Sequence, residues 1–149
     1  MEDLEWIRSW LLTYPGWDES SLQVDFSEGK PESTGLFYNG TREISRQIDV
    51  QGNALVCRRH SFTLRRNVPD HTGSGAPAKY LMDLHGWISR ENTLGNAPAL
   101  GCLPERNRIA AGEGGLVKVT AGGVAVYEMK LWVEFYTYEE GWVDDGSNI

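Results

Sequence analysis

Cysteine is scarce in this chain, with two residues, Cys57 and Cys102, among 149. They lie far apart, and a domain of this length builds enough core to need no disulfide. We therefore expect both thiols to be reduced and buried, with a single disulfide between them as the alternative. Long hydrophobic runs are also missing, because no apolar stretch approaches the roughly 20 residues of a membrane span. Residues 1–3 are acidic where a secretion signal is basic, so we expect no signal peptide.

Basic residues are in the minority, with 14 Lys and Arg against 21 Asp and Glu, a net charge of −7 and a pI near 4.9. This balance argues against a protein whose main task is to bind nucleic acid, which needs a basic face. It suits a cytoplasmic protein, or a channel lining along which DNA passes without binding. The hydrophobic fraction of 40%, with six Trp and six Tyr, excludes a disordered chain. The length is typical of one domain.

Motifs for catalysis, cofactors and metals are missing as well. No ligand spacing typical of a metal site relates the cysteines to the three histidines, His60, His71 and His85. Ser61 follows His60 directly, and adjacent strand residues point to opposite faces, so the two form no triad. The glycine runs at 112–115 and 122–123 lack the Lys-Ser or Lys-Thr of a phosphate loop. We predict no catalytic, cofactor-binding or metal-binding residue.

The clearest pattern that is present is a strand over residues 124–136. Every second residue is apolar, and the alternate residues are mostly charged or amphipathic; the apolar set is Ala125, Tyr127, Met129, Leu131, Val133 and Phe135. Strict alternation places one set on each side of a strand. Residues 116–120 and a turn at 121–123 complete a hairpin. Its apolar face predicts a cover of helices or a second sheet.

Two helices are predicted by apolar spacing. Leu4, Ile7 and Leu11 recur every three or four residues, and Pro15 stops this first helix. The second helix begins near residue 74 or 75, ends near 91–92, and carries the stripe Tyr80, Leu81, Leu84, Trp87 and Ile88. This stripe is the candidate cover for the sheet. Gly86 costs the helix about 1 kcal/mol relative to Ala, and we expect close packing against the sheet to explain it.

The remaining strands are shorter or less regular. We predict strands at 22–26, 35–38, 44–50, 54–66 and 106–111, with a turn at 39–40 and a two-residue hairpin turn at Gly52 and Asn53. The predicted fold class is α+β, with a mixed or antiparallel sheet of four to five strands and two main helices packed on one face. A single domain spans residues 1–136, and residues 137–149 form an acidic tail.

Basic side chains gather in and just after the strand at 54–66, at Arg58, Arg59, Arg65 and Arg66. A local nucleic-acid contact is one interpretation. Salt bridges within the subunit or to a neighbour are the other. We favour salt bridges, because no aromatic residues are interleaved on the same face as stacking platforms.

Several stretches together resemble a known family. They are 10–15, 22–26, 87–92 (Trp-Ile-Ser-Arg-Glu-Asn), 95–101 (Gly-Asn-Ala-Pro-Ala-Leu-Gly) and the closing hairpin. In this order they resemble a small minor structural protein of tailed bacteriophages and prophages of Gram-positive bacteria, the tail terminator or tail-completion protein. In that family a helix ends in a Trp-plus-acidic segment, continues into a Gly-Asn-x-Pro-x-Leu-Gly loop and is followed by two strands. The resemblance covers most of the chain; residues 34–41 and the acidic tail have no counterpart.

The resemblance implies an α+β structural protein of the virion without catalytic residues. Such proteins form a ring, usually a hexamer, that caps the tail tube, stops its polymerisation and joins the tail to the neck. The implied partners are further copies of the chain, the major tail tube protein and a neck or head-completion protein, with DNA only in transit. The implied location is the top of the tail, after assembly in the host cytoplasm. The alternatives are a neck or head-completion protein and, less favoured, a small cytosolic enzyme or ligand-binding domain.

A closed ring needs a heterologous interface, in which one patch meets a different patch on the next subunit. The expected interface residues are Arg58, Arg59, Arg65, Arg66, Glu128, Lys130 and Glu134. Loops at 67–75 and 91–106 are expected to reach the tube or the neck and to order on docking, through Asn67, Asp70, His71, Asn92, Asn96, Glu105 and Arg106. We also expect the inner wall of the ring to carry more acidic than basic side chains.

Overall fold

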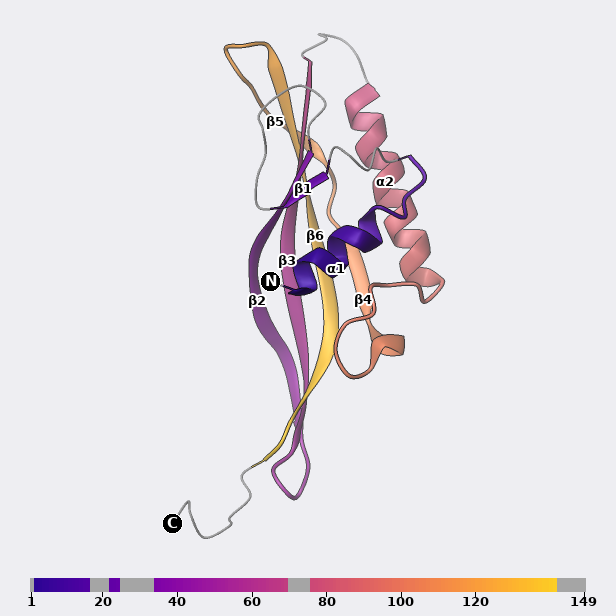
Figure 1. The fold of residues 1–149 in the computed structure, drawn as a ribbon, viewed down its shortest axis with the longest axis vertical. Coiled ribbons are helices and arrows are strands. Elements are labelled where there is room, and N and C mark those ends of the chain that lie inside the picture. The colour runs from indigo at the N-terminus through magenta and orange to yellow at the C-terminus, as the bar shows by residue number, and fades with distance from the viewer. Residues whose placement is uncertain (1, 17–21, 25–33, 70–75, 142–149) are drawn as a thin grey trace.

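The computed structural model describes residues 2–16, 22–24, 34–69 and 76–141. Its strands form one sheet in the order β1-β2-β3-β6-β4, with β5 also paired to β6 (Figure 1). The elements are α1 (Glu2–Leu11), β1 (Leu22–Val24), β2 (Thr34–Ile48), β3 (Ala54–Pro69), α2 (Ala76–Thr93), the 3-10 helix η2 (Pro104–Arg106), β4 (Arg108–Ala111), β5 (Gly115–Val119) and β6 (Val124–Glu139). The α+β class is confirmed. The sheet is mixed, because β1 runs parallel to β2, and its six strands are one more than the largest number predicted.

The predicted alternation in β6 is confirmed from Met129 to Phe135, whereas near the start of the strand Tyr127 is half-buried and Val126 of the other set is buried. Ala125, Met129, Leu131, Val133 and Phe135 are each at most 5% exposed. β6 pairs antiparallel with β3 along the whole of both strands, from Val124 opposite Pro69 to Glu139 opposite Ala54. The strand therefore runs three residues into the segment predicted as the acidic tail, because β3 is long enough to pair with it.

Both helices cover the same face of the sheet. The apolar side chains of α1 and α2 join the inward side chains of β2, β3, β4 and β6 in one cluster; the helical members are Leu4, Ile7, Leu11, Leu81, Leu84, Trp87 and Ile88. The ring of Trp87 lies 4.9 Å from that of Trp10 and 5.2 Å from that of Tyr14, which joins the two helices. The opposite face of the sheet carries no helix (Figure 1).

β2 is one continuous strand, so the turn predicted at residues 39–40 is wrong. Two bulges let β2 stay paired with β3 from Thr34 to Ile48, at the cost of two positions that lack a partner. The first bulge contains Gly40, whose φ of +122° is unfavourable for other residues. Turn-forming residues at 39 and 40 therefore mark a bulge.

The turn after β2 is longer than predicted. Five residues separate Ile48 from Ala54. The Asp49 carboxylate accepts hydrogen bonds from the backbone N–H of Gln51 at 2.8 Å and of Asn53 at 3.0 Å. An aspartate that binds backbone groups just after itself in this way stabilises a wider turn than two residues would give.

Two expectations about single residues are corrected. Gly86 is not packed against the sheet, because a Cβ built there would meet no atom within 4 Å. Cys57 is buried, as predicted, whereas Cys102 is exposed, and both thiols are free. The segment that carries Cys102 crosses the surface of the sheet instead of entering the core.

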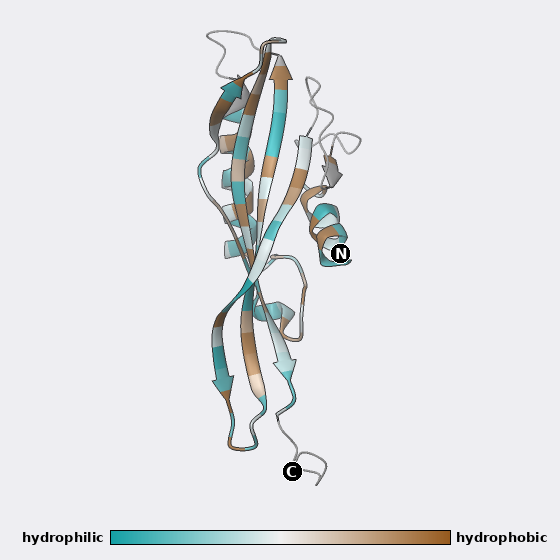
Figure 2. Ribbon diagram, turned by 90° about the vertical axis from the view of Figure 1, so that its left-hand side faces the viewer, coloured by the Kyte–Doolittle hydropathy of each residue, from teal (hydrophilic) through white to brown (hydrophobic). Residues whose placement is uncertain are grey.

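One end of the sheet extends past the helices. The ends of β2, β3 and β6 around the 49–53 turn continue as a narrow ribbon below α1 and α2 (Figures 1 and 2). Along this ribbon β2 is exposed from Thr41 to Ile48. The molecule thus has a helix-covered body and a projecting three-stranded ribbon.

Candidate functional site

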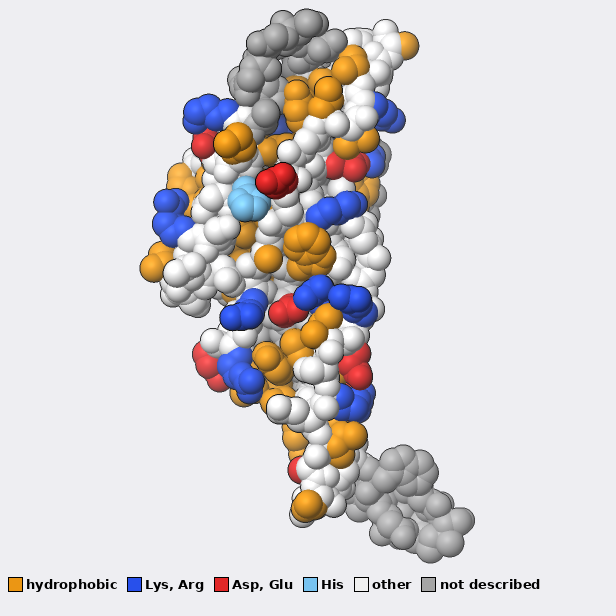
Figure 3. All heavy atoms as spheres, turned by 180° about the vertical axis from the view of Figure 1, so that it is seen from behind, with side chains coloured by type: hydrophobic (Ala, Val, Ile, Leu, Met, Phe, Trp, Pro, Cys, Tyr) orange, Lys and Arg blue, Asp and Glu red, His pale blue; other side chains and the backbone are white. Residues whose placement is uncertain are grey.

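The helix-free face of the sheet carries paired charges (Figure 3). Arg59 lies opposite Glu134 and Arg65 lies opposite Glu128 on β3 and β6. An Arg59 Nη2 to Glu134 Oε2 distance of 2.7 Å and an Arg65 Nε to Glu128 Oε2 distance of 2.7 Å make both pairs direct ion pairs. Lys130 donates to the Thr63 hydroxyl at 2.7 Å. Cross-strand pairs of opposite charge stabilise the register.

The other two predicted arginines are on the opposite side of β3. Arg66 Nη1 donates to Thr34 Oγ1 at 3.0 Å, and its guanidinium lies 4.2 Å from the ring centre of Tyr80 on α2. Burial raises the pKa of Tyr80 to about 12, although the nearby Arg66 opposes the shift. Arg58 pairs with Glu139 in the ribbon. The seven predicted interface residues therefore occupy two faces, and salt bridging within the subunit holds for Arg58, Arg59 and Arg65.

The ribbon contains a small ion network centred on Arg46. Its guanidinium lies 2.7 Å from Glu43 and 2.9 Å from Glu139, which also binds Arg58. Hydrogen bonds from Arg46 are the main cause that holds the pKa of the Glu43 and Glu139 carboxyls below the ordinary value. The network joins the two outer strands of the ribbon.

The first of the predicted contact loops is partly strand. Asn67 lies within β3 and is 2% exposed, because pairing of β3 with β6 continues to Pro69. Asp70 and His71 lie outside the described residues. The expectation of a loop that starts at residue 67 is therefore wrong at its first three positions, 67–69.

The second predicted loop is held against the sheet. Asn92 Oδ1, in the last turn of α2, accepts from the Ile109 N–H at 2.9 Å. The Asn96 side-chain NH₂ donates to Glu91 at 2.8 Å, and the backbone carbonyl of Asn96 accepts from the Trp10 indole N–H at 2.7 Å. Hydrogen bonds from side chains and backbone thus hold this segment to α1, α2 and β4 within one subunit.

Asn107 fixes the rest of the same segment. Its buried side-chain NH₂ donates to the carbonyls of Pro98 at 2.9 Å and Leu100 at 2.7 Å. The Cys102 N–H donates to the Tyr136 carbonyl on β6 at 2.8 Å. Glu105 and Arg106 on η2 remain exposed, so these two predicted contact residues are accessible on a fixed support.

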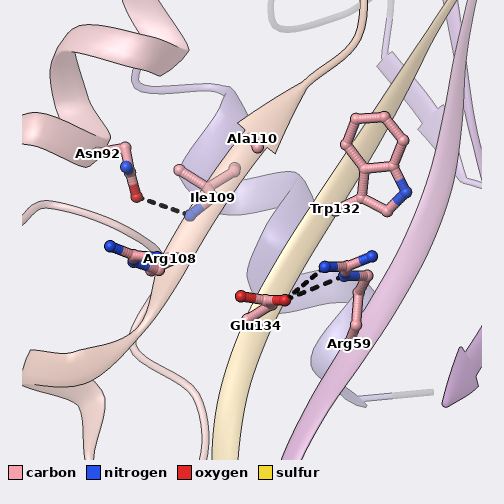
Figure 4. A pocket seen from close by; sticks show the side chains of 7 residues that line it. All are labelled: Arg59, Asn92, Arg108, Ile109, Ala110, Trp132 and Glu134. Carbon is pink, nitrogen blue, oxygen red and sulfur yellow. Dashed lines mark hydrogen bonds and ion pairs between the residues drawn. The ribbon is translucent and has the colours of Figure 1, made fainter. Parts of the chain in front are cut away.

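A hollow of about 500 Å³ lies where the helix-free face meets β4 (Figure 4). Its lining includes Arg59, Glu134, Trp132, Arg108 and Asn92. Arg59 and Glu134 bind each other, whereas exposed Arg108 on β4 forms no ion pair in the described part of the chain. Arg108 lies opposite Glu134 in the β4–β6 pair, so the hollow contains two guanidinium groups and one carboxylate, with the Trp132 indole further along β6.

A second hollow lies on the helix-covered side, next to the first turn of α1. It measures about 360 Å³, and its lining includes Glu2, Asp3, Glu5 and Trp6. Neither Glu2 nor Glu5 forms an ion pair among the described residues, and Trp6 is 52% exposed. This flank is acidic, whereas the hollow beside β4 has a free arginine.

The sequence patterns did not predict a series of hydrogen bonds that runs through His60. His60 Nε2 lies 2.9 Å from Asp3 Oδ2, and its Nδ1 is hydrogen-bonded to Thr41 Oγ1, which in turn contacts Tyr38 Oη. An Asp, a His and a hydroxyl in this order resemble the parts of a nucleophilic triad. The imidazole, however, is 4% exposed and its centre lies 4.4 Å from the Phe135 ring. We infer that these hydrogen bonds hold α1 on the sheet. Only a contact prediction between residues 57 positions apart could have found it.

Comparisons with known proteins do not assign the chain to a group: no protein-family model matches it, and no similar sequence is found among curated proteins. Across the described residues, no three His, Cys, Asp or Glu side chains are placed to bind a metal ion together. None of the helices in that part of the chain is both long and apolar enough to cross a bilayer.

Proposed function

We propose that the chain is a structural subunit that assembles into a closed ring and terminates the tail tube of a bacteriophage. The resemblance in residues 10–15, 22–26, 87–92 and 95–101 supports this reading. The α+β architecture agrees with it. Residues 87–101 form the end of α2 and the start of the segment fixed against β6.

The observation that carries the proposal is the one-sided cover of the sheet. Both helices pack on one face, and the opposite face has no helix over it: its side chains on β3 and β6 are mostly half-buried, and those of Lys130, Arg108 and Ala110 are exposed. Such a subunit covers one face of its sheet with its own helices and leaves the other face accessible. Its two hollows also differ in charge, and this asymmetry suits heterologous contacts with copies of itself. The accessible face is then used on assembly.

Electron microscopy of particles made without this chain tests the proposal. A terminator predicts over-long tails, or tails that lack heads, because nothing stops the tube. Purified protein added to such tails should cap their ends as a ring. Heads that leak DNA while tails keep their normal length would instead indicate a neck or head-completion protein. Normal particles would overturn both.

A further inference from the structure

We propose that the subunits of the ring join through the acidic first turn of α1 on one copy and the arginine-lined hollow beside β4 on the next. The acidic patch consists of Glu2, Glu5 and Trp6. The basic patch consists of Arg106, Arg108 and the hollow that Trp132 lines. The assignment rests on the self-assembly proposed above and names the two surfaces that meet. The occupant of each patch is a second copy of this chain.

Charge complementarity is the first argument. Glu2 and Glu5 are exposed and form no ion pair among residues that the structure describes. On the other patch, Arg108 has no carboxylate partner in that same part of the chain, and Arg106 lies 4.5 Å from the ring centre of Tyr136 without one. The other large charge clusters, around Arg46, Arg59 and Arg65, are already neutralised within the subunit. The two patches therefore carry exposed charges of opposite sign that no ion pair neutralises in the described part of the subunit; Arg42, Glu105 and Glu113 are other exposed charges of this kind.

Shape is the second argument. Trp6 on α1 is 52% exposed. Tryptophan is enriched among the residues that contribute most to binding at protein interfaces, so an exposed tryptophan marks a candidate contact. The hollow beside β4 has a volume of about 500 Å³ and offers the Trp132 ring on one side. An indole can enter it while the carboxylates next to it reach Arg108. In return, the acidic hollow of about 360 Å³ next to Trp6 can take a guanidinium.

Position is the third argument. Asp3, in the acidic turn, binds His60 on β3. His60 lies opposite Val133 on β6, and Val133 lies opposite Ile109 on β4. The two patches are therefore at the same level along the strands. They lie on opposite sides of the sheet, because α1 covers one face and the hollow opens on the other (Figures 1 and 4).

Equal levels matter for closure. A heterologous contact closes into a ring only when successive subunits are related by rotation without a rise, and otherwise it builds a filament. If the strands run parallel to the ring axis, two patches at the same height along the strands relate successive subunits without a rise along that axis. Contact between the exposed strand β5 and the exposed edge of β2 lacks this property. β5 pairs with residues 125–128 of β6, whereas the exposed part of β2 lies level with residues 133–139.

Charge reversal tests the interface in the intact chain. The variant Glu2→Lys/Glu5→Lys and the variant Arg106→Glu/Arg108→Glu should each weaken self-association by about 100-fold or more, because like charges then face each other. All four substitutions in one chain restore opposite charges and should restore assembly. The readout is the mass in solution by light scattering as a function of concentration, with circular dichroism to verify folding.

Matched controls separate the possible failures. Glu113→Lys/Lys118→Glu exchanges two exposed charges near β5 and should leave assembly unchanged, whereas Trp6→Ala should weaken it without a change of charge. A ring that forms normally in both reversal variants overturns this interface and leaves the tail terminator proposal standing. An assembly that follows the predicted loss and rescue, but does not cap tails, upholds the interface and overturns that function. A chain that is monomeric at every concentration overturns both.

Discussion

Gly86 is exposed on α2, and no atom lies within 4 Å of the position that a Cβ would take. Glycine in a helix costs about 0.5–1 kcal/mol relative to Ala, through lost backbone entropy. We therefore expect Gly86→Ala to raise the free energy of unfolding by that amount. Urea denaturation measures it as a higher midpoint at unchanged slope. A lower midpoint would mean that the glycine approaches a surface of the folded protein after all.

Gly101 provides the matched control. Its φ of +71° is unfavourable for other residues, and a Cβ there would lie 2.1 Å from the carbonyl oxygen of Tyr136. Gly101→Ala should lower the free energy of unfolding by more than about 1 kcal/mol. Replacement of glycine by alanine is thus expected to stabilise the protein at Gly86 and to destabilise it at Gly101. The sequence alone does not show which effect each glycine will have.

At the scale of whole elements, the sequence predicts well whatever depends on periodicity. The alternation at 124–136 gives the buried face of β6, and the spacing in 80–88 gives the buried stripe of α2. It fails where one distant side chain decides the geometry. Asn92 and Asn107 fix a segment that reads as a free loop, and Gly40 lets β2 continue through an apparent turn.

The ribbon of β2, β3 and β6 gives a pH-dependent prediction. The pKa values of Glu43 and Glu139 are lowered below 4.5 in the folded protein, mainly by hydrogen bonds from Arg46. A carboxyl with a lowered folded pKa stabilises the fold above its unfolded pKa and loses that contribution as the pH falls through the folded value. The loss therefore occurs below pH 4.5. Arg46→Met should raise both pKa values toward 4.5 and shrink this pH dependence.

Carboxyl NMR titration of Glu43 and Glu139 measures the change residue by residue. The control is Arg42→Met, which removes a neighbouring charge that makes no ion pair in the part of the chain described. It should leave both titrations nearly unchanged. Equal shifts in the two variants would show that general charge in the ribbon, and not the Arg46 hydrogen bonds, sets the two pKa values.

At the scale of the whole molecule, the charge distribution bears on passage of DNA. The net charge is −7, and on the helix-free face Arg59 and Arg65 are paired with Glu134 and Glu128, which leaves Arg108 without an ion pair in the described part of the chain. DNA affinity comes mainly from unneutralised Lys and Arg that displace counterions from phosphates. The intact chain is therefore expected to bind duplex DNA only weakly at physiological salt.

Removing the two partner carboxylates should change this. Glu128→Gln/Glu134→Gln leaves Arg59 and Arg65 without their ion pairs, and each arginine that gains a phosphate steepens the dependence of log affinity on log salt by about 0.9. Fluorescence anisotropy with a labelled duplex should show tighter, more salt-sensitive binding, with a slope steeper by roughly 2. The control Glu105→Gln/Glu113→Gln removes the same charge from exposed residues that have no ion pair in the described structure. Equal gains in both variants would mean that net charge, and not pairing on the helix-free face, keeps DNA from binding.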